Sequence, residues 1–109
     1  MKIKWEGLSP EEQRIGRSIF LLVGSEPRLL EFLFDPMEFR IRRRAGILRD
    51  EAWEFSDAEQ LQIRVALDIW SGSGHVQLWE LFEGWEASEW AKFIRAMGEL
   101  KNLPSGTLC

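Results

Sequence analysis

The chain has 109 residues, a net charge of −4, six Trp and seven Phe but no Tyr, and only one His and one Cys. One His and one Cys at the last position supply no recognisable Cys–His or Ser–His–acid nucleophile set and no cluster of His and Cys metal ligands. The acidic balance also disfavours a general nucleic-acid or anionic-membrane binder. We therefore predict no catalytic residue, no cofactor, no metal and no small-molecule substrate.

The chain is predicted to form one domain without a membrane segment. Its longest uncharged apolar run, Ile19 to Val23, is far shorter than the roughly 18–20 residues that a membrane span needs. The first six residues contain no apolar signal segment. We expect a cytoplasmic, all-α single domain over 1–109, with a loose tail over 102–109 where Pro, Ser and Gly favour a loop.

The first predicted helix spans about 10–23. Ser9 precedes a proline at the first helical position, and Glu12 completes a capping box. Gly24 offers a stop for this helix. A shorter helix follows and is expected to end near 35–36, where Asp and Pro interrupt the pattern.

The segment 36–55 carries two competing patterns. Apolar residues recur at helical spacing, namely Met37, Ile41, Ala45 and Leu48. Three of the apolar residues also alternate with charged ones as in a strand, namely Met37, Phe39 and Ile41. We favour the helix. The alternative is a small β-hairpin or two-stranded element formed by 2–6 and 37–49.

A central helix is predicted over about 57–70. Ser56 and Glu59 form a second capping box before it, and a glycine-rich turn over 71–74 ends it. Apolar residues cover most of its circumference and leave one polar stripe, which consists of Asp57, Gln60, Arg64 and Asp68. Two more helices are expected, a short one over about 77–84 and a last one over about 87–101. The predicted fold is a compact all-α domain of five or six helices around this central helix.

Most aromatic residues fit a predicted core stripe, and two do not. In the short helix the stripe consists of Leu78, Leu81, Phe82 and Trp85. Trp79 falls off this stripe, and Trp53 stands between Glu51 and Glu54. Because Trp and Arg are enriched at interface hot spots, we predict that Trp79 and Trp53 contact a partner.

One cluster of basic residues accompanies these tryptophans: Arg40, Arg42, Arg43, Arg44 and Arg49. These arginines either pair with the protein's own carboxylates, or contact an acidic protein or second subunit, or contact nucleic acid. Residues 1–49 carry a net charge of +3 and residues 50–109 carry −7. Such segregated charge is compatible with a homodimer in which the two halves complement each other across a two-fold axis.

The order of helices over 58–103 resembles the three-helix core of helix-turn-helix and winged-helix regulators. The resemblance implies that the last helix would enter the major groove with its first turns. Those turns carry Glu86, Ser88 and Glu89 before the first cation, Lys92. Acidic side chains at this place are repelled by phosphates, so the helical order does not by itself predict DNA binding.

We therefore expect a non-catalytic protein–protein interaction module that binds another protein or itself. Its predicted partner-binding residues are Trp79, Trp53, Arg40, Arg42, Arg43, Arg44 and Arg49. The alternative is a nucleic-acid-binding regulator that uses 58–103 or the arginine cluster. A third class is a small enzyme that uses paired carboxylates or a metal, for which Glu80 and Glu83 share a helix face without a spacing that specifies a site.

Overall fold

The computed structural model describes residues 6–35 and 37–101. Within these ranges the chain forms six α-helices, one 3-10 helix and one short antiparallel hairpin. In chain order they are α1 (Pro10–Val23), α2 (Pro27–Leu33), β1 (Phe34–Asp35), β2 (Arg40–Ile41), α3 (Ala45–Glu51), η1 (Ala52–Glu54), α4 (Asp57–Ser71), α5 (Leu78–Gly84) and α6 (Ala87–Leu100). The predicted all-α class is confirmed, with the hairpin as a small addition. The predicted loose tail over 102–109 and residues 2–5 of the proposed strand lie outside the described residues.

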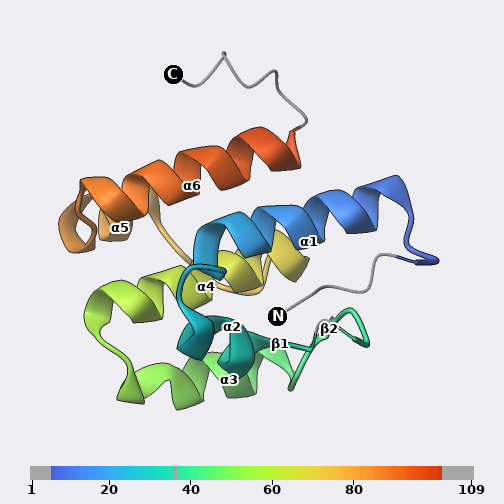
Figure 1. Cartoon of the computed structure of the whole chain (residues 1–109). Coiled ribbons are helices and arrows are strands. Elements are labelled where there is room, and N and C mark those ends of the chain that lie inside the picture. Colours follow the sequence, from blue (N-terminus) through green and yellow to red (C-terminus); the bar gives the residue numbers. More distant parts are fainter. Residues whose placement is uncertain (1–5, 36, 102–109) are drawn as a thin grey trace.

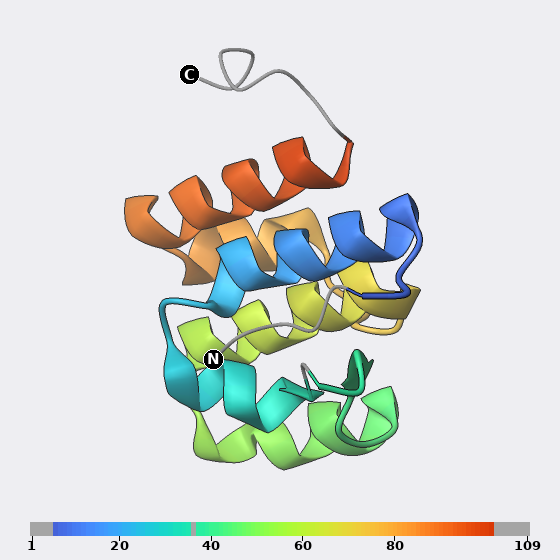
Figure 2. The same cartoon turned by 45° about the vertical axis from the view of Figure 1, so that its right-hand side comes forward.

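The helices are stacked in layers (Figure 1). Helix α1 lies between α6 and α4, while α2, α3 and the hairpin lie on the far side of α4. Figure 2 shows the same order from a second direction, and α5 packs against α4. Helices α1 and α6 run antiparallel, because Arg17 pairs with Glu99 near one end and Glu26 with Lys92 near the other.

Small residues let α1 and α6 approach each other closely. Gly16 and Ser18 are buried on α1, and Ala96 and Gly98 are buried on α6. The hydroxyl of Ser18 donates a hydrogen bond to the carbonyl of Ala96 at 2.7 Å. This bond satisfies a hydroxyl group that is fully removed from water.

Both predicted capping boxes are present. The Ser9 hydroxyl accepts from the Glu12 N–H at 3.1 Å, and the Glu12 carboxylate accepts from the Ser9 N–H at 3.0 Å. Ser56 and Glu59 repeat the arrangement at the start of α4. Gly72, with φ of 70°, ends α4 in the left-handed conformation that suits glycine. These local signals explain why the predicted bounds 10–23 and 57–70 agree with α1 and α4 to within a residue.

Helix α4 occupies the centre, as predicted. It packs against α1, α2, α3 and α5. Six of its residues are buried: Leu61, Gln62, Ile63, Val65, Ala66 and Leu67. The Gln62 amide points to the Leu22 carbonyl of α1 at 3.5 Å, which gives this buried polar group a partner.

The helix that we favoured for 36–55 begins only at Ala45. The Asp35 carboxylate accepts from the N–H groups of Met37 and Glu38, at 3.0 and 3.3 Å, and holds a turn there. After the turn β2 pairs antiparallel with β1, with Ile41 opposite Phe34. The strand alternative therefore applies to part of the segment, with 34–35 as the partner.

Tertiary packing explains why the helical pattern is not followed. Phe39 has a φ of 48°, which no helix allows. Its ring packs against Phe34 and Trp70, with centroid distances of 5.5 and 5.6 Å. A contact with residues distant in sequence thus fixes this turn, and local periodicity cannot reveal it.

Six of the thirteen Trp and Phe residues form two clusters. Phe34, Phe39 and Trp70 form the first, near the hairpin. Trp85, Trp90 and Phe93 form the second, between the start of α6 and α4, with mutual centroid distances of 5.7 to 5.9 Å. The Trp85 indole N–H also donates to the Ala58 carbonyl of α4 at 3.0 Å. This bond ties the end of α5 to the beginning of α4.

Candidate functional site

Three large apolar side chains of α5 lie on the outside of the protein. Leu78, Trp79 and Phe82 are 69, 66 and 67% exposed. The rings of Trp79 and Phe82 stack on each other, 5.2 Å apart and inclined by 18°. We call these three residues the α5 surface. The predicted exposure of Trp79 is confirmed.

Leu78 and Phe82 correct our prediction, because both were assigned to the core stripe. Within α5 only Leu81 is buried, and Trp85 is buried at the residue that follows the helix. The helix has seven residues and packs against α4. The rest of the predicted stripe is left in solvent.

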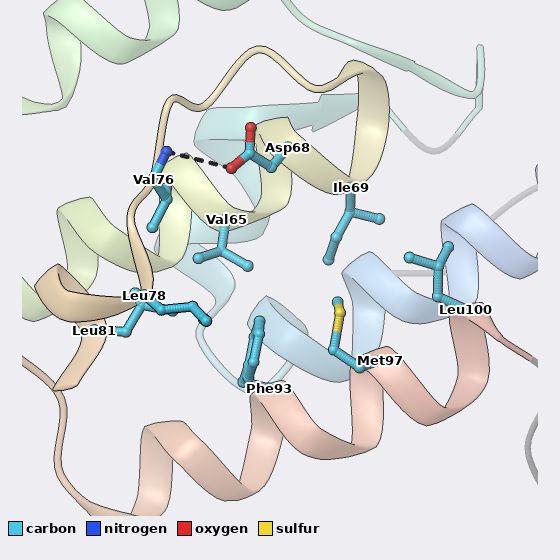
Figure 3. A pocket seen from close by; sticks show the side chains of 9 residues that line it. All are labelled: Val65, Asp68, Ile69, Val76, Leu78, Leu81, Phe93, Met97 and Leu100. Carbon is cyan, nitrogen blue, oxygen red and sulfur yellow. Dashed lines mark hydrogen bonds between the residues drawn. The ribbon is translucent and has the colours of Figure 1, made fainter.

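A cavity of about 230 Å³ adjoins the α5 surface (Figure 3). It lies between α4, α6 and the segment that leads into α5. Its lining is apolar except for one carboxylate, and consists of Val65, Asp68, Ile69, Val76, Leu78, Leu81, Phe93, Met97 and Leu100. Leu78 belongs both to this lining and to the α5 surface. The two features therefore form one continuous apolar region.

Arg64 of α4 holds the segment that precedes α5. Its guanidinium donates to the carbonyl of Gly74 at 3.1 Å and to the carbonyl of His75. It also donates to both carboxylate oxygens of Glu80 on α5, at 2.9 and 3.2 Å. The Arg64 hydrogen bonds, together with the Gln77 N–H, hold the pKa of Glu80 below its ordinary value.

Asp68, one turn further along the same face of α4, also holds this segment. Its carboxylate accepts from the N–H of Gly74 at 2.8 Å and from the N–H of Val76 at 3.4 Å (Figure 3). At Gly74 the chain passes so close to α4 that a Cβ atom would lie 1.8 Å from the Arg64 carbonyl oxygen. This position therefore requires glycine.

Arg64 and Asp68 belong to the polar stripe predicted for the central helix, and that prediction does not include this role. Both side chains are half-buried and face the glycine-rich turn. The one signal in the sequence is an arginine and an aspartate four residues apart, just ahead of that turn. This signal is weak, because most such pairs are simply exposed to solvent.

Carboxylates border the α5 surface. Residues 78–89 contain four Glu and no Lys or Arg. Glu80 is paired with Arg64. The Glu89 carboxylate accepts hydrogen bonds from the Ser88 hydroxyl and the Glu86 N–H, and these two bonds lower the pKa of Glu89, which also lies near Lys92. The other two, Glu83 and Glu86, are exposed and make no ion pair within the described residues. The surface is therefore apolar with an acidic border.

The predicted arginine cluster is partly paired within the protein. Arg43 donates to both carboxylate oxygens of Glu51 at 2.6 Å. Arg42 donates to the Glu31 carbonyl, and Arg49 donates to the Ser73 carbonyl. The side chains of the other two arginines are exposed, and neither guanidinium group makes a hydrogen bond or ion pair within the described part of the chain. These are Arg40 and Arg44.

The predicted site residues do not share one surface. Trp53 is 72% exposed, as predicted, and lies on η1. The arginine cluster lies on the hairpin and α3, beyond α4, whereas α5 lies beside α6 (Figures 1 and 2). Trp79 and the arginines thus belong to different ends of the helical stack.

The structure also bears on the other function classes. The first turn of α6 begins after Glu86 and presents Ser88 and Glu89, and no Lys or Arg. Phosphates would be repelled there, since the lowered pKa keeps Glu89 ionised. Within the described residues, no three His, Cys, Asp or Glu side chains gather as a metal site. No helix in that part of the chain has the length and apolar character needed to cross a bilayer.

Comparison of the chain with protein-family models, curated proteins and solved structures gave no match.

Proposed function

We propose that this protein is a non-catalytic protein-interaction module that binds its partner through the α5 surface. The observation that carries the proposal is the exposure of Leu78, Trp79 and Phe82 on one short helix. Each of them is about two-thirds exposed. At about 150–250 Å² for a large side chain, the three together present roughly 400 Å² of accessible apolar area. Contiguous patches of this size on a monomer are often functional.

The stacked aromatic pair supports this proposal. Trp79 and Phe82 stack on each other and are not covered by another element of the described chain. Tryptophan is the residue most enriched at hot spots, where an aromatic anchor buries a large area with few rotatable bonds. Binding would remove both rings from water together.

The adjoining cavity gives the partner a place to insert a side chain. A volume of about 230 Å³ has room for a large apolar side chain, and nearly all of its lining is apolar. Hot spots on one protein tend to fill such pockets on the other. The partner is therefore expected to bring an apolar anchor, with cations around it that face Glu83 and Glu86.

Polar contacts keep this region in shape before a partner arrives. Arg64 and Asp68 fix the segment that leads into α5, and the Trp85 indole fixes the segment that leaves it. A surface that is already ordered loses less conformational entropy on binding. These contacts are the reason why a helix of seven residues can serve as a binding surface.

The test is affinity capture from the native source with the wild type, the Trp79→Ala/Phe82→Ala variant and the Trp53→Ala variant as baits. Trp53 is the matched control, because it is an equally exposed tryptophan outside the α5 surface. A partner retained by wild type and Trp53→Ala, lost by the double variant, and then reproduced with purified components supports the proposal. Equal retention by all three baits refutes it.

A further inference from the structure

A second exposed surface lies at the opposite end of the helical stack and has the opposite charge. It consists of Met37 in the turn of the hairpin, Arg40 on β2, Arg44 before α3 and Ile47 on α3. Met37 and Ile47 are 66% and 44% exposed. We call these four residues the basic surface. It combines large apolar side chains with exposed charges, as the α5 surface does together with its acidic border.

The two chain segments that carry these surfaces have net charges of opposite sign and equal size. Residues 37–49 contain five Arg and one Glu, a net charge of +4, and residues 78–89 contain four Glu, a net charge of −4. On the basic side, Arg43 is neutralised by Glu51, and Glu38 stands beside the turn. The exposed charges of Arg40 and Arg44 remain available, as do those of Glu83 and Glu86 on the other side.

We propose that the basic surface of one copy of the chain binds the α5 surface of a second copy, with Met37 entering the cavity beside α5. This inference rests on the proposed role of α5 as a binding surface and names its occupant. Methionine suits such a cavity, because its unbranched side chain adapts to an irregular apolar space. Arg40 and Arg44 would then face Glu83 and Glu86 around the apolar contact.

The placement of the two surfaces determines the geometry of the assembly. The elements that carry the two surfaces lie in different layers, α5 beside α6 and the hairpin beyond α4 (Figures 1 and 2), so the proposed contact joins unlike surfaces of two copies. Copies would associate head to tail, which is a heterologous interface that closes into a ring or grows with concentration. This arrangement replaces the two-fold homodimer that the segregated charges alone suggest.

The contact is expected to be weak. The α5 surface offers roughly 400 Å² of apolar side chain, against about 800 Å² buried per partner in a standard stable interface. Association should therefore be visible at high protein concentration and weaken with added salt, because exposed charges at a contact are screened.

The experiment uses two variants that each lose one surface. Trp79→Ala/Phe82→Ala loses the α5 surface, and Arg40→Glu/Arg44→Glu loses the basic surface. The charge control is Arg95→Glu/Lys101→Glu, which reverses two exposed cations of the α6 region. Sedimentation equilibrium measures the average mass of each protein over a wide range of concentration, and circular dichroism verifies that each variant is folded.

The proposal predicts a specific pattern. The wild type and the charge control grow in mass with concentration, and each surface variant associates about tenfold more weakly or stays monomeric. A mixture of the two surface variants forms a dimer and stops there, because each supplies the surface that the other has lost. Substitution of Met37 by Ser weakens the wild-type association.

Three results would overturn it. They are a wild type that stays monomeric at the highest attainable concentration, association that survives the loss of Arg40 and Arg44, and a variant mixture that does not dimerise. None of them bears on capture of another protein by the α5 surface. A failure here is thus distinguishable from a failure of the proposed function, which the capture experiment tests separately.

Discussion

Replacement of Arg64 by methionine is the perturbation that tests how α5 is held. The substitution keeps most of the volume of the side chain and removes its charge and all its donors. It leaves the carbonyls of Gly74 and His75 and the carboxylate of Glu80 without this partner. We expect the segment before α5 to loosen while the α1 and α6 pair stays intact, because no contact of that pair involves Arg64.

The magnitude follows from the contacts. A hydrogen bond to a charged group is worth about 1.5–3 kcal/mol. Since the side chains of Arg64 and Glu80 are 24% and 36% exposed, their ion pair is worth at most about 1 kcal/mol. We expect a loss of about 2 kcal/mol in the free energy of unfolding, and at about 4–8 °C per kcal/mol for a chain of this size the melting temperature should fall by roughly 10 °C.

Urea unfolding followed by circular dichroism measures the loss, and hydrogen exchange locates it. Amide protons of α5 should exchange faster in the variant, while those of α1 keep their protection. The Glu80→Gln variant and the double variant complete a cycle, in which the coupling free energy should be about 0.5–1 kcal/mol. A loss of less than about 0.5 kcal/mol, within the range of ordinary surface substitutions, would refute the idea that Arg64 holds α5.

Three further predictions concern the same region. Gly74→Ala should destabilise the protein by about 1–3 kcal/mol in thermal or urea unfolding, because its Cβ would meet a backbone carbonyl at 1.8 Å. Gly84→Ala should destabilise it less, because there the Cβ meets only a leucine methyl group, at 2.5 Å. A larger loss of stability in Gly84→Ala than in Gly74→Ala would contradict this packing. The pKa of Glu80 is lowered in the folded state from the ordinary value of 4.5, so its contribution to the free energy of unfolding is complete above that value and is lost as pH falls through the lower, folded pKa. The stability difference between wild type and Glu80→Gln should therefore be constant near neutral pH and shrink below about pH 4.5. A stability difference that grows on acidification would contradict the lowered pKa. Trp79→Ala should change the free energy of unfolding by no more than about 0.5 kcal/mol, since the side chain is 66% exposed; a larger loss would mean that this tryptophan supports the core.

Features that depend on neighbours in sequence were predictable. The Ser9–Glu12 and Ser56–Glu59 pairs satisfy the first backbone donors of their helices through contacts three residues apart. Such contacts form wherever the local sequence allows them, so α1 and α4 begin where the sequence indicates. The exposure of Trp79 was also predictable, because its place on the helical wheel differs from that of Leu81.

Features that depend on contacts between distant segments were not predictable. The helical spacing around Ile41 is as good as that of a real helix, but Phe39 packs against Trp70 and the chain turns there. Likewise, Phe82 has the spacing of a core residue. Whether it reaches the core depends on how Arg64 positions the preceding segment, and nothing local encodes that position.

A helix of seven residues has little stability of its own in water, because nucleation is costly and few hydrogen bonds repay it. Most short helices compensate by burying an apolar face, yet α5 buries only Leu81. Its order comes from its ends: Glu80 binds Arg64 near the start, and Trp85 donates to the Ala58 carbonyl just after the end. This arrangement leaves the exposed apolar side chains of α5 uncovered, and under the proposed function they contact a partner. Arg64 therefore supports the position of Trp79 through Glu80 and the segment before α5. Replacement of Arg64 should weaken binding at the α5 surface although Leu78, Trp79 and Phe82 are unchanged.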